Sequence, residues 1–455
     1  MATFDVIVIG AGPAGEVVAG QLAEGGLEVA VVEEHLVGGE CSFYACMPSK
    51  ALVRPPEITA EAGRIPGAGT GSVDASATLA RRDEVIHGLD DAGQLPWLED
   101  RGVTVLRGHA TLAGERQVEV AGETHEARRA VVLATGSTTA LPPIDGLADA
   151  RPWTNREATT AKTAPGRLLI MGAGAVGSEM AYAWQSLGSQ VTLIEGERHV
   201  LPNEEVFACE QVTHALEALG VDVRTGQRAT RVARADGAVT ATLTDGSTVE
   251  GDELLVATGR RARTEELGLD RLGLEPGKPV KADRLGRVEG APWLHAIGDV
   301  NAHAPWTHMG KAQARLLADH LLGHDPAPPP PHADGPLSPR VTFTDPQVAA
   351  VGHTTKTADR AGLDPLVIDA PTGGNAGGSF VGKGAEGTTR FLVDRDRGTL
   401  IGVTMTGPEV AEALHAATIA VVAQVPVETL QHAIPAFPTR SEVWLQLTEG
   451  YRRSR

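Results

Sequence analysis

The sequence predicts an α/β protein in which two βαβ units, related by an internal repeat, precede a smaller α+β unit. The repeat is visible because a glycine-rich stretch between two apolar runs recurs 162 positions later (172 − 10). In each half, a later apolar strand ends in Ala-Thr-Gly, at 134–136 and 257–259. A proline-rich segment at 325–339 then leads to a region of alternating apolar and polar residues, a pattern that indicates half-buried strands.

The composition excludes several classes of protein. The chain has 455 residues, 42% of them hydrophobic, and a formal net charge of −18, which disfavours nucleic acid and anionic membranes as partners. No apolar run approaches the roughly 20 residues of a membrane span, and the N-terminus lacks the basic segment of a secretory signal. Because the chain has only three cysteines, we expect a protein of the reducing cytoplasm. We expect its partner to be a small-molecule substrate.

The first repeat, which begins at Asp5, reads as a dinucleotide-binding βαβ unit. In Gly-Ala-Gly-Pro-Ala-Gly, the first glycine permits a tight turn, the second lets the backbone approach a pyrophosphate, and the third lets the helix pack on the strand. The helix N-terminus attracts phosphate, and the acid that ends the second strand accepts hydrogen bonds from ribose. The residues predicted to bind here are Gly10, Gly12, Pro13, Ala14, Gly15 and Glu33.

The second repeat begins at Arg167 and has the same sequence of apolar run, glycines, helix, apolar run and acid. A lone Gly-rich turn is a weak signal, but a copy in the full strand–helix–strand context is a strong one. The residues predicted to bind a second dinucleotide are Gly172, Gly174, Val176, Gly177, Glu195 and Gly259.

The rest of the chain follows from strand and helix patterns. The apolar segment 294–300 ends in Gly298-Asp299, which places a carboxylate at the C-terminal edge of a strand, where α/β proteins bind ligands. We expect helices at about 308–322, 408–424 and from 440, with 325–339 as a stiff linker. The predicted domains are 1–150 with 270–335, 151–269, and 338–455.

Cys41 and Cys46, with four residues between them, are predicted to form a redox dithiol. The spacing does not suit zinc, which would need two more soft ligands, and a structural disulfide is improbable in a reducing compartment. The helix expected from Met47 would put Cys46 at a positive helix end near Lys50, which favours a thiolate. Cys209, in a helical pattern, reads as a buried hydrophobe. We expect no metal site.

Two dinucleotide sites and one dithiol suggest an electron path from a nicotinamide through a flavin to sulfur. In order, the motifs GAGPAG, GGxCxxxxCxPSK, ATGS, GAGxxGxE, ATGR and AIGDV resemble those of the flavoprotein disulfide reductases, the class I pyridine nucleotide–disulfide oxidoreductases such as dihydrolipoamide dehydrogenase, glutathione reductase and mercuric reductase. The resemblance runs from Asp5 to about Leu447. It implies a glutathione reductase-like fold and a homodimer in which the partner's C-terminal domain completes each active site.

The resemblance also implies roles for individual residues. Cys46 would be the charge-transfer thiolate beside the flavin, and Cys41 the interchange sulfur that meets the substrate. Lys50 would lie by the flavin N5 atom and pair with Glu179. Glu195 would repel a 2′-phosphate and so favour NADH over NADPH, although Arg198 lies close downstream. Beyond the first glycine motif, the implied FAD-binding residues are Gly39, Lys50, Ala134, Thr135, Gly136, Gly298 and Asp299.

The sequence departs from the family near its C-terminus. Disulfide-reducing members carry a His-Pro-Thr there, whose histidine is the acid–base for the interchange thiol. This chain has Phe437 in that position, followed by Glu442 where the orienting acid would be. A phenyl ring cannot move a proton, and such catalysis is typically worth about 10²–10⁴-fold. Tyr44, between the cysteines, either replaces the lost acid or packs, whereas His432 lies five residues out of register.

The main interpretation is therefore an FAD enzyme that passes electrons from NADH through Cys41 and Cys46 to a non-standard disulfide or an electrophile. Two alternatives stay open: a quinone- or metal-type reductase acting at the flavin, and a non-catalytic redox sensor or complex subunit.

Overall fold

The computed structural model describes residues 2–69 and 71–454, which form two compact units. Unit 1 comprises Met1–Pro48, Asp83–Ala140 and Arg260–Pro329. Unit 2 comprises Ser49–Arg82, Leu141–Gly259 and Pro330–Arg455. Unit 2 thus includes three segments that the sequence assigned to the first domain, 49–82, 141–150 and 330–335, whereas unit 1 includes 260–269, which was assigned to the second. The division into three domains stays a prediction.

Unit 1 is built on an eight-stranded sheet with the order β16-β17-β6-β1-β2-β3, extended by β5 on β6 and β4 on β5. The strands β17, β6, β1, β2 and β3 run parallel. The last four residues of β1 are all buried, as expected for a parallel strand covered on both faces. The strands of the sheet are β1 (Thr3–Ile9), β2 (Val29–Glu33), β3 (Thr104–Arg107), β4 (Ala110–Gly114), β5 (Gln117–Val120), β6 (Glu123–Leu133), β16 (Arg287–Val288) and β17 (Ala291–Ala296).

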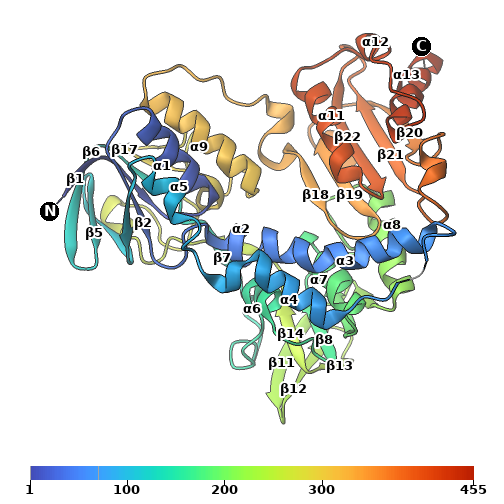
Figure 1. Cartoon of the computed structure of the whole chain (residues 1–455), viewed down its shortest axis with the longest axis horizontal. Helices are drawn as coiled ribbons and strands as arrows, with labels where there is room; N and C mark the ends of the chain where they lie inside the picture. Colours follow the sequence, from blue (N-terminus) through green and yellow to red (C-terminus); the bar gives the residue numbers. More distant parts are fainter. Residues whose placement is uncertain (1, 70, 455) are drawn as a thin grey trace. The chain divides into compact units, whose positions relative to one another are not determined.

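Two helices of unit 1, α1 (Pro13–Glu24) and α9 (Thr307–Leu321), pack against each other beside this sheet (Figure 1). They are in contact where Gly310 meets the first turn of α1, since a Cβ on Gly310 would lie 3.4 Å from the Ala14 Cβ. The unit also contains α2 (Gly39–Phe43), α5 (Leu95–Glu99) and the small β7 (Ser137–Thr139) and β15 (Arg260–Ala262) ribbon.

Unit 2 contains the second βαβ repeat, in a parallel sheet with the order β10-β9-β8-β14. Helices α7 and α8 contact each other beside it, and α8 ends at Gly220, whose φ of 100° is the left-handed geometry of a helix C-terminus. These elements are β8 (Arg167–Met171), β9 (Gln190–Glu195), β10 (Asp222–Thr225), β14 (Glu253–Val256), α6 (Asn155–Thr160), α7 (Ala175–Ser186) and α8 (Val206–Leu219), with the antiparallel β11 (Ala229–Ala235), β12 (Ala238–Leu243) and β13 (Thr248–Gly251).

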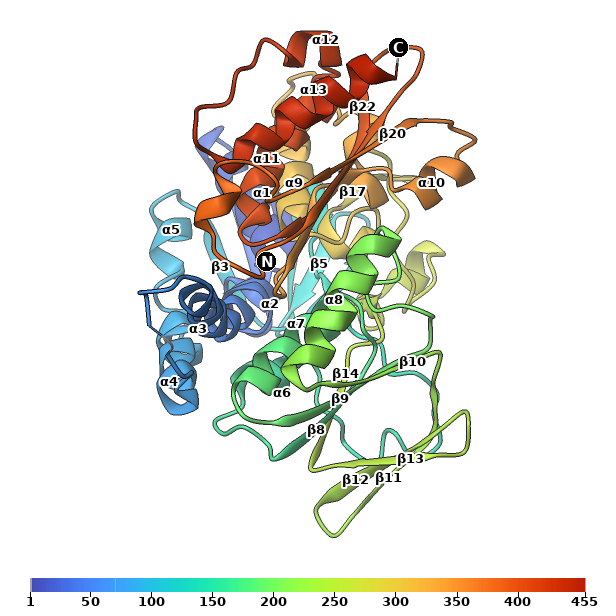
Figure 2. The same ribbon diagram turned by 90° about the vertical axis from the view of Figure 1, so that its right-hand side faces the viewer.

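The C-terminal part of unit 2 is a five-stranded antiparallel sheet with the order β18-β19-β22-β21-β20. Helix α11 packs on β19 and β22, and α13 packs on β20 (Figure 2). The elements are β18 (Arg340–Thr342), β19 (Gln347–Gly352), β20 (Leu366–Pro371), β21 (Thr388–Val393), β22 (Leu400–Gly407), α10 (Thr355–Arg360), α11 (Val410–Val422), α12 (Val427–Leu430) and α13 (Val443–Arg453). The prediction of two Rossmann-like folds plus an α+β domain is confirmed.

The remaining helices are α3 (Cys46–Arg64), which begins in unit 1 and continues into unit 2, and α4 (Ala75–Val85). The expectation of a linker throughout 325–339 is wrong in its second half. Pro331–Ala333 and Gly335–Leu337 form 3₁₀ turns, and Ala333 and Ser338 are buried. Proline is tolerated at the start of such turns because its missing N–H would be unpaired there. None of the helices in the described part of the chain combines the length and the apolar composition that a membrane span requires.

Candidate active site

The first glycine turn, between β1 and α1, has the geometry of a phosphate-binding loop. Gly10 has a φ of +102°, and a Cβ on Gly15 would lie 1.9 Å from the Gly10 carbonyl oxygen, so neither position admits a side chain. Around Gly12, which caps α1, a Cβ would meet nothing within 4 Å. This open side exposes the helix N-terminus, and the turn therefore fits a dinucleotide pyrophosphate.

The second turn, between β8 and α7, repeats this geometry. Gly172 has a φ of +96°, and a Cβ on Gly177 would lie 1.8 Å from the Gly172 oxygen. Gly174 caps α7 and has open space beside it. Val176 in the first turn of α7 is exposed, and Gly259 has a φ of +141° with no atom near its missing Cβ. The open side of this second turn therefore also fits the pyrophosphate of a dinucleotide.

The acids at the ends of β2 and β9 accept equivalent backbone hydrogen bonds. Glu33 accepts hydrogen bonds from the Ala11 and His35 N–H groups, each at 2.8 Å. Glu195 accepts the equivalent bonds from Ala173 at 2.6 Å and Glu197 at 2.8 Å. Each carboxylate oxygen keeps a further lone pair, so both acids can still accept from a ribose hydroxyl.

The other predicted residues of the first cofactor site meet in unit 1. Asp299 accepts a hydrogen bond from Ser137 at 2.5 Å, and Arg260 donates to Ser137 Oγ at 2.7 Å. Thr135 donates to a carbonyl at 2.8 Å, and Gly298 N–H donates to Gln313. The remaining positions line this region through close backbone packing: Ala134 against Gly10, Gly39 against Gly12, Ala14 against Gly298, and Gly136 in a left-handed turn. Pro13 is the first residue of α1.

The dithiol lies where two helices meet. Cys41 is on α2 and Cys46 is the first residue of α3, and both are half-buried thiols. The Cys46 Sγ atom is 3.3 Å from Thr307 Oγ1 at the start of α9. The neighbouring Cys46 and burial raise the pKa of the Cys41 thiol, whereas Thr307 and Lys311 lower it. The Cys46 sulfur therefore opposes the development of a negative charge on Cys41.

Between the cysteines, Tyr44 follows the end of α2, with its ring centroid 6.5 Å from that of the buried Phe43 and tilted by 57°. This geometry is an aromatic packing contact. The structure therefore provides a packing role for Tyr44, and a proton-transfer role stays a prediction.

Lys50 and Glu179 are brought together in unit 2. Lys50 Nζ is 2.6 Å from Glu179 Oε2, and the Phe343 N–H donates to the other carboxylate oxygen at 3.0 Å. The Lys50 ammonium also lies 4.6 Å from the centre of the Phe343 ring. Glu179 is buried, so this charge-assisted pair removes the cost of an unpaired buried carboxylate.

The C-terminal motif carries no imidazole at the expected position. The Phe437 side chain is 77% exposed, and the Phe437–Pro438 peptide bond is cis. Glu442 accepts a weak hydrogen bond from the Gly377 N–H at 3.4 Å. Glu442 thus contacts backbone, and its role as an orienting acid stays a prediction.

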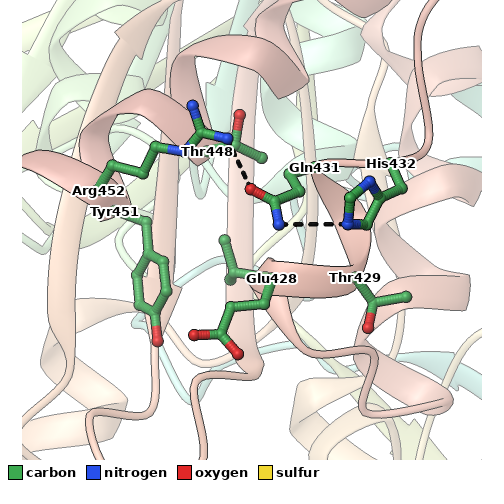
Figure 3. A pocket seen from close by; sticks show the side chains of 8 residues that line it. Glu428, Thr429, Gln431, His432, Thr448, Tyr451 and Arg452 are labelled. Carbon is green, nitrogen blue, oxygen red and sulfur yellow. Dashed lines mark hydrogen bonds between the residues drawn. The ribbon is translucent and has the colours of Figure 1, made fainter.

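His432 lies elsewhere, at a cavity of about 400 Å³ between α12 and α13 (Figure 3). Its Nε2 atom is 3.3 Å from Gln431 Nε2, and Gln431 accepts a hydrogen bond from Arg452 at 2.7 Å. None of the cavity-lining residues belongs to the dithiol or to the glycine turns. Among the described residues, no group of three or more potential ligands could hold a metal ion.

Sequence reasoning missed several residues around the dithiol and the acid at 299. Arg260 follows the second Ala-Thr-Gly motif directly, so its position was a usable signal. Thr307 and Lys311 begin a helix that is distant in sequence, and nothing local connects them to the cysteines. Glu16 follows the third glycine of the first turn, but it looked like an ordinary helix residue.

Comparison with known proteins agrees with this architecture. Residues 4–315 match the family model of pyridine nucleotide-disulphide oxidoreductases, and residues 338–448 match the dimerisation domain of that family. A dihydrolipoyl dehydrogenase from Thermus scotoductus is 33% identical over 470 residues, covering 100% of this chain and 98% of the relative. One from Haloferax volcanii is 30% identical over 463 residues, covering 98% and 96%.

Solved structures are similar over their full length. LpdA from Mycobacterium tuberculosis gives a TM-score of 0.86 at 26% identity and covers 100% of both chains. The Cu(II) complex of the HOCl-induced flavoprotein disulfide reductase RclA from Escherichia coli gives 0.87 at 23% identity and covers 99% of both. The latter likeness shows the fold alone.

Proposed function

Because the chain belongs to the pyridine nucleotide-disulphide oxidoreductase family, we propose that it is an FAD enzyme that oxidises NADH and reduces an acceptor through Cys41 and Cys46. The observation that carries this proposal is the dithiol itself. Cys46 stands at a helix N-terminus beside Thr307, and Cys41 lies next to it with a raised pKa. Paired thiols of unequal acidity are suited to reversible disulfide chemistry.

FAD and a nicotinamide dinucleotide are the cofactors that the family implies. The turn at Gly10, Gly12 and Gly15, with Glu33 and Asp299, would hold FAD, and the turn at Gly172, Gly174 and Gly177 would hold the nicotinamide cofactor. Together the bound cofactors supply hydride acceptance and a pair of electrons for the Cys41–Cys46 disulfide. The position of Lys50 beside the flavin stays a prediction.

The chain's own residues set how the sulfurs behave. The α3 N-terminus and the Thr307 hydroxyl stabilise a Cys46 thiolate. The pKa of Cys41 is raised, because the hydrogen bond to the neighbouring Cys46 sulfur and then burial oppose a negative charge on it. Cys41 is therefore the sulfur that must be deprotonated before it attacks an acceptor.

The acceptor class follows from Phe437. The relatives named above are dihydrolipoyl dehydrogenases, but a phenyl ring in place of the acid–base histidine gives slow turnover with an ordinary alkyl disulfide. We therefore assign an activated disulfide, or an electrophile whose leaving group needs no enzyme proton. The same absence favours a second candidate, a reductase of quinones or metal ions that acts at the flavin.

NADH is the proposed donor because Glu195 is a buried carboxylate at the ribose position. Its negative charge would repel a 2′-phosphate. The enzyme is also proposed to work as a homodimer in which the partner's C-terminal domain completes each site. Ile434 and Phe437 on the family's dimerisation domain are 75% and 77% exposed, which supports a covering partner.

Serine variants of the two cysteines test the proposal. Cys41→Ser and Cys46→Ser should each abolish NADH-dependent reduction of 5,5′-dithiobis(2-nitrobenzoate), an activated aromatic disulfide, while the flavin stays bound. Reduction of a quinone by the same variants is measured in parallel. Full retention of both activities would reject the dithiol route and support the flavin-level candidate.

A further inference from the structure

Arg228 lies close to the acid proposed to bind the ribose of the second dinucleotide. Glu195 ends β9, and Arg228 follows the end of β10, the strand that pairs with β9 in parallel. Backbone hydrogen bonds join the segments after these two strands. The Gly226 N–H donates to the Glu197 carbonyl at 2.8 Å, and the Gln227 N–H donates to the Glu195 carbonyl at 3.0 Å. Arg228 is thereby placed at the carboxyl edge of the sheet, where α/β proteins bind ligands.

The Arg228 guanidinium packs against the backbone at Gly196. Its Nη2 atom is 2.9 Å from Glu197 Oε1, and the side chains of both partners are more than half exposed. The guanidinium fills the space that a side chain at position 196 would take, since a methyl group there would lie 2.5 Å from the guanidinium carbon. Glycine at this position therefore leaves room for a flat cationic group next to Glu195.

The strand order indicates which part of a dinucleotide reaches Arg228. In the order β10-β9-β8-β14, the turn that fits a pyrophosphate follows β8, and the acid proposed for the ribose ends β9. Neighbouring strands lie about 4.8 Å apart. A dinucleotide that places its pyrophosphate at the first strand and its ribose at the second continues with its adenine toward the end of β10, where Arg228 lies.

A guanidinium plane is chemically suited to an adenine. Nucleobases stack on the flat face of arginine through cation–π and dispersion attraction. The ion pair with Glu197 restrains the plane and offsets its charge, and Glu195 adds a buried carboxylate nearby. Within this group of charges no net positive charge is left for a 2′-phosphate, so the plane is what Arg228 offers to an adenosine.

We propose that Arg228, held by Glu197 against Gly196, forms the surface on which the adenine of the nicotinamide dinucleotide stacks. This inference rests on the proposed function, because it names a binding contact of the electron donor proposed for the second glycine turn. It adds a determinant of affinity that does not depend on the negative charge of Glu195.

The contact can be measured by binding alone. ADP-ribose is titrated into the FAD-loaded protein by isothermal titration calorimetry, because bound FAD keeps this ligand out of the first glycine turn. We expect Arg228→Ala to weaken ADP-ribose binding about tenfold, as for the loss of one stacked base. Arg228→Lys keeps the charge and loses the plane, so it should weaken binding to a similar extent. Full rescue by lysine would overturn stacking as the role of Arg228.

Gly196→Ala tests the position of the guanidinium without removing it. The three atoms nearest to the added methyl group all belong to the flexible Arg228 side chain, so the methyl group displaces that side chain and leaves the backbone in place. We expect Gly196→Ala to weaken ADP-ribose binding about as much as Arg228→Ala, and the double variant to bind no more weakly than either single variant. Additive losses in the double variant would overturn the proposal.

Arg231→Ala is the matched control variant. Arg231 is an exposed arginine of the same unit and pairs with the Asp145 carboxylate at 3.4 Å, so its loss should leave ADP-ribose binding unchanged. Flavin absorbance and thermal unfolding show that each variant is folded. Reduced nicotinamide mononucleotide, which lacks the adenosine half, is the control ligand, and it should reduce the flavin equally fast in wild type and Arg228→Ala. An equal loss with this donor would overturn an adenine contact.

The 2′-phosphate derivative of ADP-ribose separates stacking from phosphate binding. Arg228→Ala should weaken both ligands by the same factor, because the adenine is common to them. A much larger loss with the phosphorylated ligand would assign Arg228 to the phosphate and overturn the proposal.

The two levels of inference fail in different ways. Wild-type protein that binds no ADP-ribose rejects the second turn as a dinucleotide site, and with it both the proposed donor and this contact. Wild-type binding that is unchanged in Arg228→Ala and in Gly196→Ala rejects the adenine contact alone.

Discussion

The two glycine turns of this chain have the same geometry, yet their helices diverge directly after the third glycine. Glu33 and Glu195 accept equivalent backbone hydrogen bonds. The first helix then continues with Glu16, whereas the equivalent residue of the second is the fully buried Ser178, which donates to the Ala173 carbonyl at 3.1 Å. The second helix has its acid one position later, at Glu179, where it pairs with Lys50.

The comparison shows that both turns have one geometry, which suits phosphate binding, and that residues outside the turn supply the chemistry. Between the strand-end acid and the Ala-Thr-Gly motif, the first half spans 101 residues (134 − 33) and the second 62 (257 − 195). The longer connection holds α2 and the start of α3, and therefore both sulfurs.

The largest effect should come from closing either turn with one methyl group. Gly15→Ala places a Cβ 1.9 Å from the Gly10 oxygen, and Gly177→Ala places one 1.8 Å from the Gly172 oxygen. We expect Gly15→Ala to abolish flavin retention, measured as absorbance per chain. Gly177→Ala should keep the flavin and lose its reduction by NADH, measured by stopped flow. Equal loss of flavin in both variants would mean that the two turns do not serve separate cofactors.

The next largest effect should come from restoring a base. Phe437 is exposed, so Phe437→His is accommodated without repacking a core. We expect turnover with lipoamide or another alkyl disulfide to rise by about 10² or more, whereas Phe437→Leu should give no gain. If the histidine variant is no faster in steady-state assays, the assignment of that position is wrong.

A buried histidine distinguishes the two parallel sheets in their response to pH. His295 on β17 of unit 1 has its pKa lowered to about 4, first by burial and then by His320. The unfolded chain therefore binds a proton at this histidine near pH 6.5, whereas the folded protein does not. The contribution of neutral His295 to the free energy of unfolding is thus fully present above pH 6.5 and is lost as the pH falls toward 4. Between pH 7 and 5 the loss should be about 2 kcal/mol.

Thermal unfolding of wild type and His295→Leu at both pH values measures this contribution. The wild-type melting temperature should fall more than that of the variant between pH 7 and 5. Parallel behaviour of the two proteins would show that another group is responsible.

The smallest effect should come from the acid of the second unit. Glu195→Ala removes the negative charge at the ribose position, and we expect the ratio of kcat/KM for NADPH to that for NADH to rise about tenfold, which is worth about 1.4 kcal/mol. Glu195→Gln keeps an acceptor for the Ala173 N–H and should give a similar rise. A constant ratio in both variants would reject charge repulsion as the basis of the preference.

Patterns that depend on near neighbours in sequence predicted most of the fold. The repeat around Gly10 and Gly172 predicted both βαβ units. The helix expected from Met47 begins one residue earlier, at Cys46. The pairing of Lys50 with Glu179 was expected only from the family resemblance, because 129 residues separate them.

Contacts set by tertiary packing could not be predicted. The position of Thr307 against Cys46 depends on how α9 packs on α1, and no local pattern encodes that arrangement. The same is true of Glu16, whose pKa is raised first by burial and then by the charge of Glu33, 17 positions further along the chain. The proline-rich stretch was assigned as a linker because composition does not reveal that Ala333 and Ser338 pack into a core.

The exposed Ile434 and Phe437 side chains have a consequence for how the protein matures. In the proposed homodimer, a newly made chain would present these large apolar groups to water until its partner binds. Correct association then competes with aggregation, and the yield of assembled protein depends on chain concentration as well as on sequence. The yield of refolding from denaturant should therefore be highest at an intermediate protein concentration, because pairing is slow in dilute samples and aggregation dominates in concentrated ones.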